Sequence, residues 1–242
     1  MPRASKIGII AALRREIREL VARPEVQRLP VMGRSLPVYV LGDVSITCAG
    51  TGRQAAARAT EEMIEQFRPE LIVSVGFAGA VDPGLCIGGV IVPDTVIEAD
   101  SGRRFSTMRG EGVLVSTNGI ATCEEKTELR EKYQALAVDM EASAVAERAG
   151  AYAVQFMAIK SISDSAATTL PDFSRFVRKN GEFATLRFLL YTMLHPTLWP
   201  ELRKLAANTE LAAKNLTSAL RNSVLDGSHL PAVNSKQAIN SR

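Results

Sequence analysis

Residues 6–22, KIGIIAALRREIRELVA, place a short apolar strand directly before an amphipathic helix. Residues 6–12 are mainly apolar over the length of one strand, which is typical of a buried strand. The following residues change to helical spacing, with Ile17, Leu20 and Val21 on one side. A strand that leads at once into a helix indicates an α/β fold.

The alternation of strand and helix patterns continues along the chain. Residues 37–41 and 44–48 are β-rich and are joined by Gly42-Asp43, a pair suited to a tight hairpin turn. Further strands are expected at residues 71–75, 88–97, 112–115, 136–138 and 153–162, and helices at 54–67, 124–133 and 142–149. The pattern predicts a single-domain α/β fold with a mixed, mostly parallel sheet flanked by helices.

The domain organisation is simple, because neither an internal repeat nor a linker interrupts this pattern. We expect one domain over residues 1–222 that includes C-terminal helices in residues 172–222. Residues 223–242 carry Gly, Pro, Ser and Asn without periodicity, so they are expected to form a disordered tail.

Composition excludes several function classes. The chain has 242 residues and a formal net charge of only +3, with basic and acidic residues interspersed, so nucleic acid is not an expected partner. Its three cysteines lie far apart and it has two histidines, which argues against a metal site. Reduced thiols fit the cytoplasm. The apolar N-terminal run is followed by Arg14, Arg15 and Glu16 instead of a cleavage site, so export is not expected.

Three acidic residues come directly after predicted buried strands. Glu16, Glu141 and Asp164 follow strands whose ends, in an open α/β sheet, form ligand sites. Each also has a purely structural explanation. Glu16 can compensate a helix dipole, Glu141 can begin a solvated helix face, and Asp164 can belong to a capping turn. Their combination favours a carboxylate-based site.

The segments around these acids resemble the nucleoside phosphorylase and nucleosidase superfamily, close to bacterial methylthioadenosine/S-adenosylhomocysteine nucleosidases. The order and approximate spacing agree over about residues 6–176. Besides the first strand and Glu16, the resemblance rests on Gly50-Thr-Gly52, Gly76-Phe-Ala-Gly79, Met140-Glu141 and Ser163-Asp164.

The resemblance implies an enzyme that breaks the N-glycosidic bond of a purine nucleoside without a cofactor or a metal. Asp164 would donate a proton to purine N7, which requires a protonated aspartic acid that apolar burial favours. Glu141 would hold the ribose hydroxyls, with Met140 packed on the sugar. Glu16 would activate water, which favours hydrolysis over phosphorolysis. Ser163 and Gly79 would line the same site, and a homo-oligomer is expected.

Three residues differ from the family pattern. Phe77 replaces a common Ser or Thr, and its ring cannot donate a hydrogen bond to phosphate or water. Asn118 lies where the family places an aromatic residue that stacks on the base. Lys160 takes the position of a common arginine and could contact the sugar or an anion, or could be a strand-end lysine that reaches solvent.

The chain also has a short connection between residues 98 and 112 and an apolar C-terminal segment, residues 186–199. Both features resemble the hopanoid-associated phosphorylase group, whose members are linked to release of adenine from adenosylhopane. The apolar segment is shorter than the roughly 20 residues that span a bilayer. It could rest at a membrane interface or guide a hydrophobic substrate, or it could pack on the sheet or on a second subunit.

The first hypothesis is therefore a nucleosidase that releases adenine from a 5′-substituted adenosine. Phosphorolysis with inorganic phosphate is a close enzymatic alternative. A nucleoside-binding or lipid-associated accessory protein without turnover, or a structural protein without a ligand, would keep the same fold.

Overall fold

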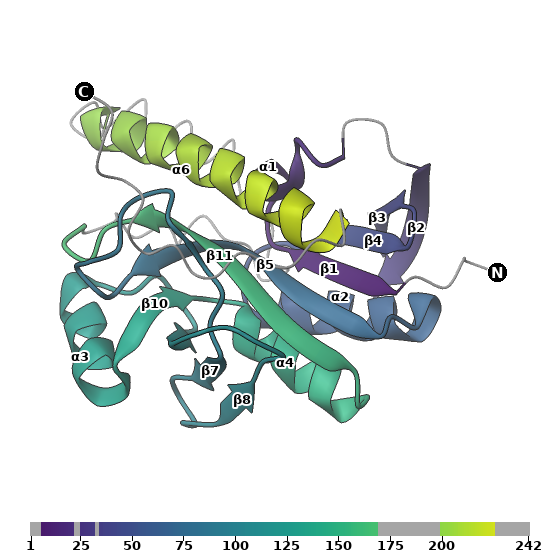
Figure 1. Cartoon of the computed structure of the whole chain (residues 1–242), viewed down its shortest axis with the longest axis horizontal. Coiled ribbons are helices and arrows are strands. Elements are labelled where there is room, and N and C mark those ends of the chain that lie inside the picture. Colours follow the sequence, from purple (N-terminus) through teal and green to yellow (C-terminus); the bar gives the residue numbers. More distant parts are fainter. Residues whose placement is uncertain (1–5, 22–24, 32–33, 169–198, 226–242) are drawn as a thin grey trace.

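A mixed sheet with helices on both faces forms the body of the protein (Figure 1). The computed structural model describes residues 6–21, 25–31, 34–168 and 199–225. The eleven strands of the described sheet are β1 (Ile7–Ala11), β2 (Glu25–Val31), β3 (Arg34–Leu41), β4 (Val44–Cys48), β5 (Leu71–Ala80), β6 (Val90–Ile91), β7 (Thr95–Glu98), β8 (Arg104–Ser106), β9 (Val113–Ser116), β10 (Ala135–Asp139) and β11 (Gln155–Asp164). The helices are α1 (Arg14–Ile17), α2 (Arg53–Phe67), α3 (Cys123–Tyr133), α4 (Ala142–Ala151) and α6 (Trp199–Leu220), followed by a π-helical turn (Arg221–Leu225).

Strand β5 is the hub of the sheet. It pairs in parallel with β1 on one side and with β11 on the other, and its last residues pair with β10. The strand order β2-β3-β4-β1-β5-β10-β9-β7-β8 has β11 branching from β5. Since Glu16, Glu141 and Asp164 belong to β1, β10 and β11 or to the residues that follow them, this topology brings three segments distant in sequence to one strand.

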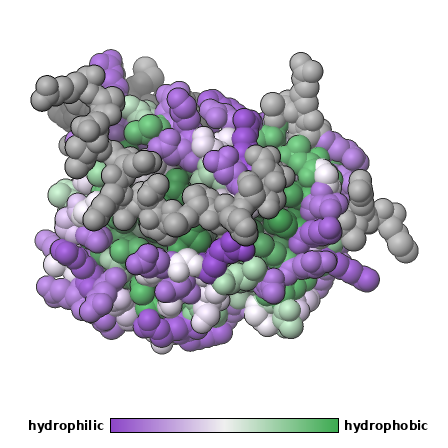
Figure 2. Space-filling view, in the orientation of Figure 1, coloured by the Kyte–Doolittle hydropathy of each residue, from purple (hydrophilic) through white to green (hydrophobic). Residues whose placement is uncertain are grey.

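The sheet buries apolar side chains on both faces. Residues of α2 and α4, such as Met63 and Val145, pack with Ile72 of β5 on one face. Ile17 of α1 and Leu216 of α6 pack with Val73 of β5 on the other. Because successive residues of a strand point to opposite faces, this alternation explains why β5 reads as a continuous apolar run. On the face seen in Figure 2, hydrophobic residues show most clearly to the right of the middle, near where Figure 1 draws β1.

The observed elements confirm the predicted α/β fold and change some of its details. The hairpin of β3 and β4 and helix α2 lie where the sequence predicts them. The predicted helix over residues 13–22 is a single turn, α1, and β2 was not predicted. Strand β5 continues through Gly76 and Gly79, where the sequence analysis ended it. The short connection between residues 98 and 112 contains β8, which pairs with β7 and was not predicted.

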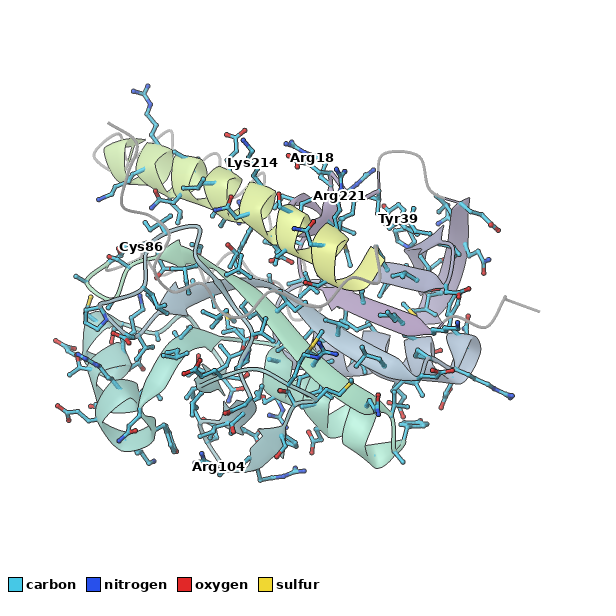
Figure 3. All side chains as sticks on the ribbon, viewed as in Figure 1. Arg18, Tyr39, Cys86, Arg104, Lys214 and Arg221 are labelled. Carbon is cyan, nitrogen blue, oxygen red and sulfur yellow. The ribbon has the colours of Figure 1, made fainter. Side chains whose placement is uncertain are left out.

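Helix α6 lies along one face of the sheet beside α1 (Figure 1). Figure 3 labels Arg18 and Arg221 where the two helices meet, and Arg221 Nη2 donates to the carbonyl of Glu19 at 2.8 Å. Helical structure extends to Leu225, three residues into the predicted tail, while residues 226–242 and the apolar segment 186–199, except Trp199, lie outside the described residues. Among the described helices, none has the length and apolar character to cross a membrane.

Candidate active site

Glu16 lies in α1, the single turn that follows β1, and only 2% of its surface is exposed. Its Oε2 accepts hydrogen bonds from the backbone N–H groups of Ala12 and Leu13 at 2.9 and 2.8 Å, and its Oε1 accepts one from Phe77 at 3.3 Å. Burial raises the pKa of Glu16, although these donors and the Lys160 ammonium oppose the shift. A carboxylate fixed on three sides, with basicity increased by burial, suits a general base.

Glu141 follows β10 and immediately precedes α4, and its side chain reaches across to the turn before α2. Its Oε1 accepts a hydrogen bond of 2.7 Å from the backbone N–H of Gly52, whose positive φ of 91° suits a glycine. Burial, followed by the repulsion of Asp139, raises the pKa of Glu141 to about 7, while Lys160 opposes the shift. Glu16 also repels the Glu141 carboxylate, so the two acids belong to one electrostatic cluster.

A fully buried lysine lies among these acids. Lys160 Nζ is 2.8 Å from Asp139 Oδ2 and donates to Ser74 Oγ at 3.0 Å. Burial alone would lower the pKa of Lys160, but Asp139, Glu141 and Glu16 outweigh it and raise the pKa above its ordinary value. Lys160 lies within β11 and is 1% exposed, so it is not a lysine whose ammonium reaches solvent. One ammonium thus faces three carboxyl groups.

Asp139, the partner of Lys160, is held in place by its own neighbours. Ser116 Oγ donates to Asp139 Oδ1 at 2.6 Å, and the backbone N–H of Ala142 donates to Oδ2 at 3.0 Å. Ser116 Oγ in turn accepts from the backbone N–H of Ser143 at 2.9 Å. Breaking a buried ion pair by removing one partner costs about 3–5 kcal/mol, so this network holds Asp139 and Lys160 firmly in place.

Asp164 ends β11 and is 3% exposed. Its Oδ2 lies 2.6 Å from the ammonium of Lys126, a residue of α3, and Ser163 Oγ is 2.8 Å from Oδ1. The pairing of β11 with β5 shifts between Ile162 and Asp164, so Ser163 is the extra residue of a bulge. Bulges redirect side chains, so this bulge changes the directions of the Ser163 and Asp164 side chains at the end of β11.

Two glycines of β5 leave room for the acids. A Cβ at Gly76 would lie 3.1 Å from Glu16 Oε1, and a Cβ at Gly79 would lie 2.8 Å from Asp164 Oδ2. Three residues of extended strand span about 10 Å. Glu16 and Asp164 therefore approach the last part of β5 three residues apart, while Val138, two residues before Met140-Glu141, pairs with Gly79.

The remaining residues named by the sequence analysis take different positions. Met140 is half-buried between β10 and α4, next to Glu141. The half-buried ring of Phe77 lies 5.5 Å from the Arg15 guanidinium carbon, while its backbone contacts Glu16. Asn118 is exposed and its amide donates to Asp100, so its described contact is with a surface acid.

Sequence reasoning missed two ionisable residues of the site. Asp139 comes two residues before Glu141, just after the predicted strand 136–138, and was given no role. Lys126 lies in the predicted helix 124–133 and was also given no role, yet it is 3% exposed. The spacing of Lys126, Leu129 and Tyr133 on one helical face was a signal that could have found it, because the other two side chains pack in a hydrophobic cluster.

Comparison with known proteins agrees with this architecture. A model of the phosphorylase superfamily matches residues 6–110 and 99–189 of the chain. The chain belongs to the phosphorylase superfamily. Among the curated members of related sequence, the 5′-methylthioadenosine/S-adenosylhomocysteine nucleosidase of Staphylococcus saprophyticus is 27% identical, in a match that covers 66% of this chain and 86% of the relative.

Solved structures show the same superfamily fold. Futalosine hydrolase of Helicobacter pylori superposes with a TM-score of 0.69 at 20% identity, covering 92% of this chain and 98% of the other. The S-adenosylhomocysteine nucleosidase of Streptococcus pyogenes, in complex with 5-methylthiotubericidin, gives a TM-score of 0.60 at 23% identity, covering 67% and 85%. At these identities the likeness concerns the fold.

Proposed function

We propose that this phosphorylase-superfamily chain is a purine nucleosidase that hydrolyses the N-glycosidic bond of a 5′-substituted adenosine and releases adenine. The observation that carries the proposal is that Glu16 and Asp164 approach the Gly76 to Gly79 segment of one strand, while Glu141 interacts electrostatically with Glu16 and Lys160. The names of related nucleosidases and an adenine complex of one of them support adenine as the base.

Each acid has a task that its surroundings support. Glu141 accepts hydrogen bonds from the ribose hydroxyls, with Met140 against the sugar. Glu16 removes a proton from the attacking water, for which its raised pKa is an advantage. Asp164 protonates the departing purine. The acids also provide negative charge near a sugar that becomes positively charged as the bond breaks.

Hydrolysis is proposed over phosphorolysis because of where the donors point. Backbone N–H groups of Ala12, Leu13 and Phe77 are directed at the Glu16 carboxylate. The Lys160 ammonium is paired with Asp139. A phosphate dianion would approach carboxyl groups whose nearby donors already have partners, and electrostatic repulsion would disfavour it.

The test is a product assay with the full chain. Candidate substrates are 5′-methylthioadenosine, S-adenosylhomocysteine, adenosine, inosine, futalosine and a 5′-alkyl adenosine, each with and without inorganic phosphate. The last compound tests the narrower version of the proposal, in which the 5′ substituent is hydrophobic as in adenosylhopane. We expect adenine and a free sugar at a rate independent of phosphate.

Other outcomes favour the alternatives. A sugar 1-phosphate formed only with phosphate would replace hydrolysis by phosphorolysis. Binding of adenosine analogues, measured by calorimetry, without release of any base would replace the enzyme by a nucleoside-binding protein.

A further inference from the structure

Asp164 lies beside the charged side chain of Lys126. Apolar surroundings alone would instead favour a neutral aspartic acid. Lys126 Nζ is 2.6 Å from Asp164 Oδ2 and donates to the Ser165 carbonyl at 3.0 Å, and both side chains are almost fully buried. A Cβ at Gly79 would lie 3.3 Å from Lys126 Cε, so the missing side chain at that position makes room for both partners.

The position of Lys126 within its helix is unfavourable without Asp164. Helix α3 begins after the capping residue Thr122, and its first turn carries Glu124 and Glu125, the charges that the helix dipole prefers there. Lys126 brings a buried cation close to the same positive end. An uncompensated buried ammonium costs several kcal/mol. The carboxylate of Asp164 is its described compensation.

We propose, on the basis of the proposed function, that Lys126 is a positioning residue that acts through Asp164 during protonation of the base. Its ammonium fixes Oδ2 and stabilises the carboxylate that remains once the proton has left. Lys126 thereby makes it easier to leave a buried carboxylate behind when the proton moves to the purine.

The bond between C1′ and N9 breaks and its electron pair goes to the purine, while the O–H bond of Asp164 breaks and an N7–H bond forms. Water adds its hydroxide part to C1′ and gives its other proton to Glu16. Base and sugar are released, and exchange with solvent returns a proton to Asp164 and removes one from Glu16. Lys126 stays charged throughout.

Among the residues that the structure describes, the charged groups around Asp164 are few enough to interpret a pH profile. Lys126 faces it from α3, while Ser163, Ser165 and Gly79 contribute neutral groups from β11, the residue after it and β5. The other ionisable residues of the site form the separate cluster around Lys160. Among them, Glu141 is proposed to bind the sugar, so its titration should change KM. Protonation of the base should instead change kcat.

The experiment compares the pH dependence of kcat in the wild-type chain and in Lys126→Met. We expect kcat of the variant to fall at least tenfold at acidic pH, because the ammonium no longer stabilises the carboxylate. The high-pH limb should move upward by roughly one pH unit or more, because removal of an adjacent positive charge favours the protonated acid. Lys126→Arg, which keeps the charge, should retain the wild-type limb.

A matched control is Lys132→Met, the same change on the exposed part of α3, for which no shift of the limb is expected. If Lys126→Met does not fold, Lys126→Gln keeps a donor for the Ser165 carbonyl and carries the same comparison. An unchanged limb in the folded uncharged variant overturns the role of Lys126, because a purely structural loss would lower kcat equally at all pH values.

Carbon NMR of the aspartate carboxyl groups tests the pair without an assay. The signal lost in Asp164→Asn identifies Asp164, and we expect it to titrate at higher pH in Lys126→Met than in the wild-type chain. Identical titration curves in the two chains would contradict the proposal. A chain that cleaves no nucleoside at any pH, although the Asp164 signal shifts in Lys126→Met, would reject the proposed function and leave the ion pair standing, so the two failures are distinguishable.

Discussion

The hydrogen bonds that hold the Glu16 carboxylate come from backbone atoms. Because three main-chain N–H groups hold the carboxylate, its position depends on the conformation of β1 and β5 and not on other flexible side chains. Such a group keeps its geometry while its own chemistry is changed, which makes it suitable for a conservative substitution.

Glu16→Gln should reduce hydrolysis by roughly two to four orders of magnitude, because an amide cannot accept the proton of water. Binding of a substrate analogue, followed by calorimetry, should change little. Glu19→Gln, an exposed acid three residues later, is the control and should be fully active. Equal loss of turnover and of binding would show that Glu16 has a structural part instead.

Glu141 should give the chain opposite pH dependences of stability and of substrate affinity. Its pKa of about 7 lies above the ordinary value of 4.5, so the folded chain retains a proton that the unfolded chain releases between these pH values. Its contribution to stability is therefore complete below pH 4.5 and is lost as the pH rises through about 7. The charged form is the better acceptor for ribose hydroxyls, so KM should fall over the upper part of this range.

Glu141→Gln separates these effects from those of other groups. Its KM should be raised and should lose the change near pH 7, and its free energy of unfolding, measured with urea at pH 5 and pH 8, should vary less with pH than that of the wild-type chain. A KM of the wild-type chain that stays constant across pH 7 would argue against sugar binding by this residue.

At the scale of elements, the shape of β5 decides how closely the acids approach. Gly76→Ala should push the Glu16 carboxylate by a few tenths of an ångström, because the new Cβ would lie 3.1 Å from Oε1. We expect kcat to fall roughly tenfold or more and the free energy of unfolding to fall by about 1–3 kcal/mol.

Gly119→Ala is the matched control for that change, since a Cβ there would meet no atom within 4 Å. Its activity and its urea midpoint should stay close to those of the wild-type chain. Full activity of Gly76→Ala would mean that the position of Glu16 is not critical for the reaction.

The same strand shows which parts of the fold and the site the sequence could predict. The first strand, the β3–β4 hairpin and α2 were predictable, because local apolar spacing and a Gly-Asp turn determine them. The end of β5 was misplaced, because glycines are usual strand breakers, whereas Gly76 and Gly79 lie within the strand where carboxylates approach its backbone.

Long-range contacts account for what sequence patterns did not show. The three acids were identifiable from their positions after strands, but the pairing of Lys126 with Asp164 joins residues 38 positions apart. The pairing of Lys160 with Asp139 joins two different strands in the same way. No local spacing encodes such partners. The sequence signal for Lys126 was its position on the same helical face as the apolar residues of α3.

At the scale of the whole molecule, α6 returns the C-terminal part of the described chain to the first strand. Leu216 is fully buried with Ile9 and Val73, so Leu216→Ala should lower the free energy of unfolding by about 2–5 kcal/mol. Leu211→Ala, in the same helix but 46% exposed, should cost much less. Equal urea midpoints for the two variants would contradict docking of α6 on the sheet.

The central claim is that three acids from distant parts of the chain act on one nucleoside. It is tested most directly by a crystal structure of the chain with a non-hydrolysable 5′-alkylthio analogue of adenosine. The account predicts the base edge within hydrogen-bond distance of Asp164, the ribose hydroxyls at Glu141, and C1′ on the side of Glu16. An analogue bound elsewhere, or touching only one of these acids, would contradict it.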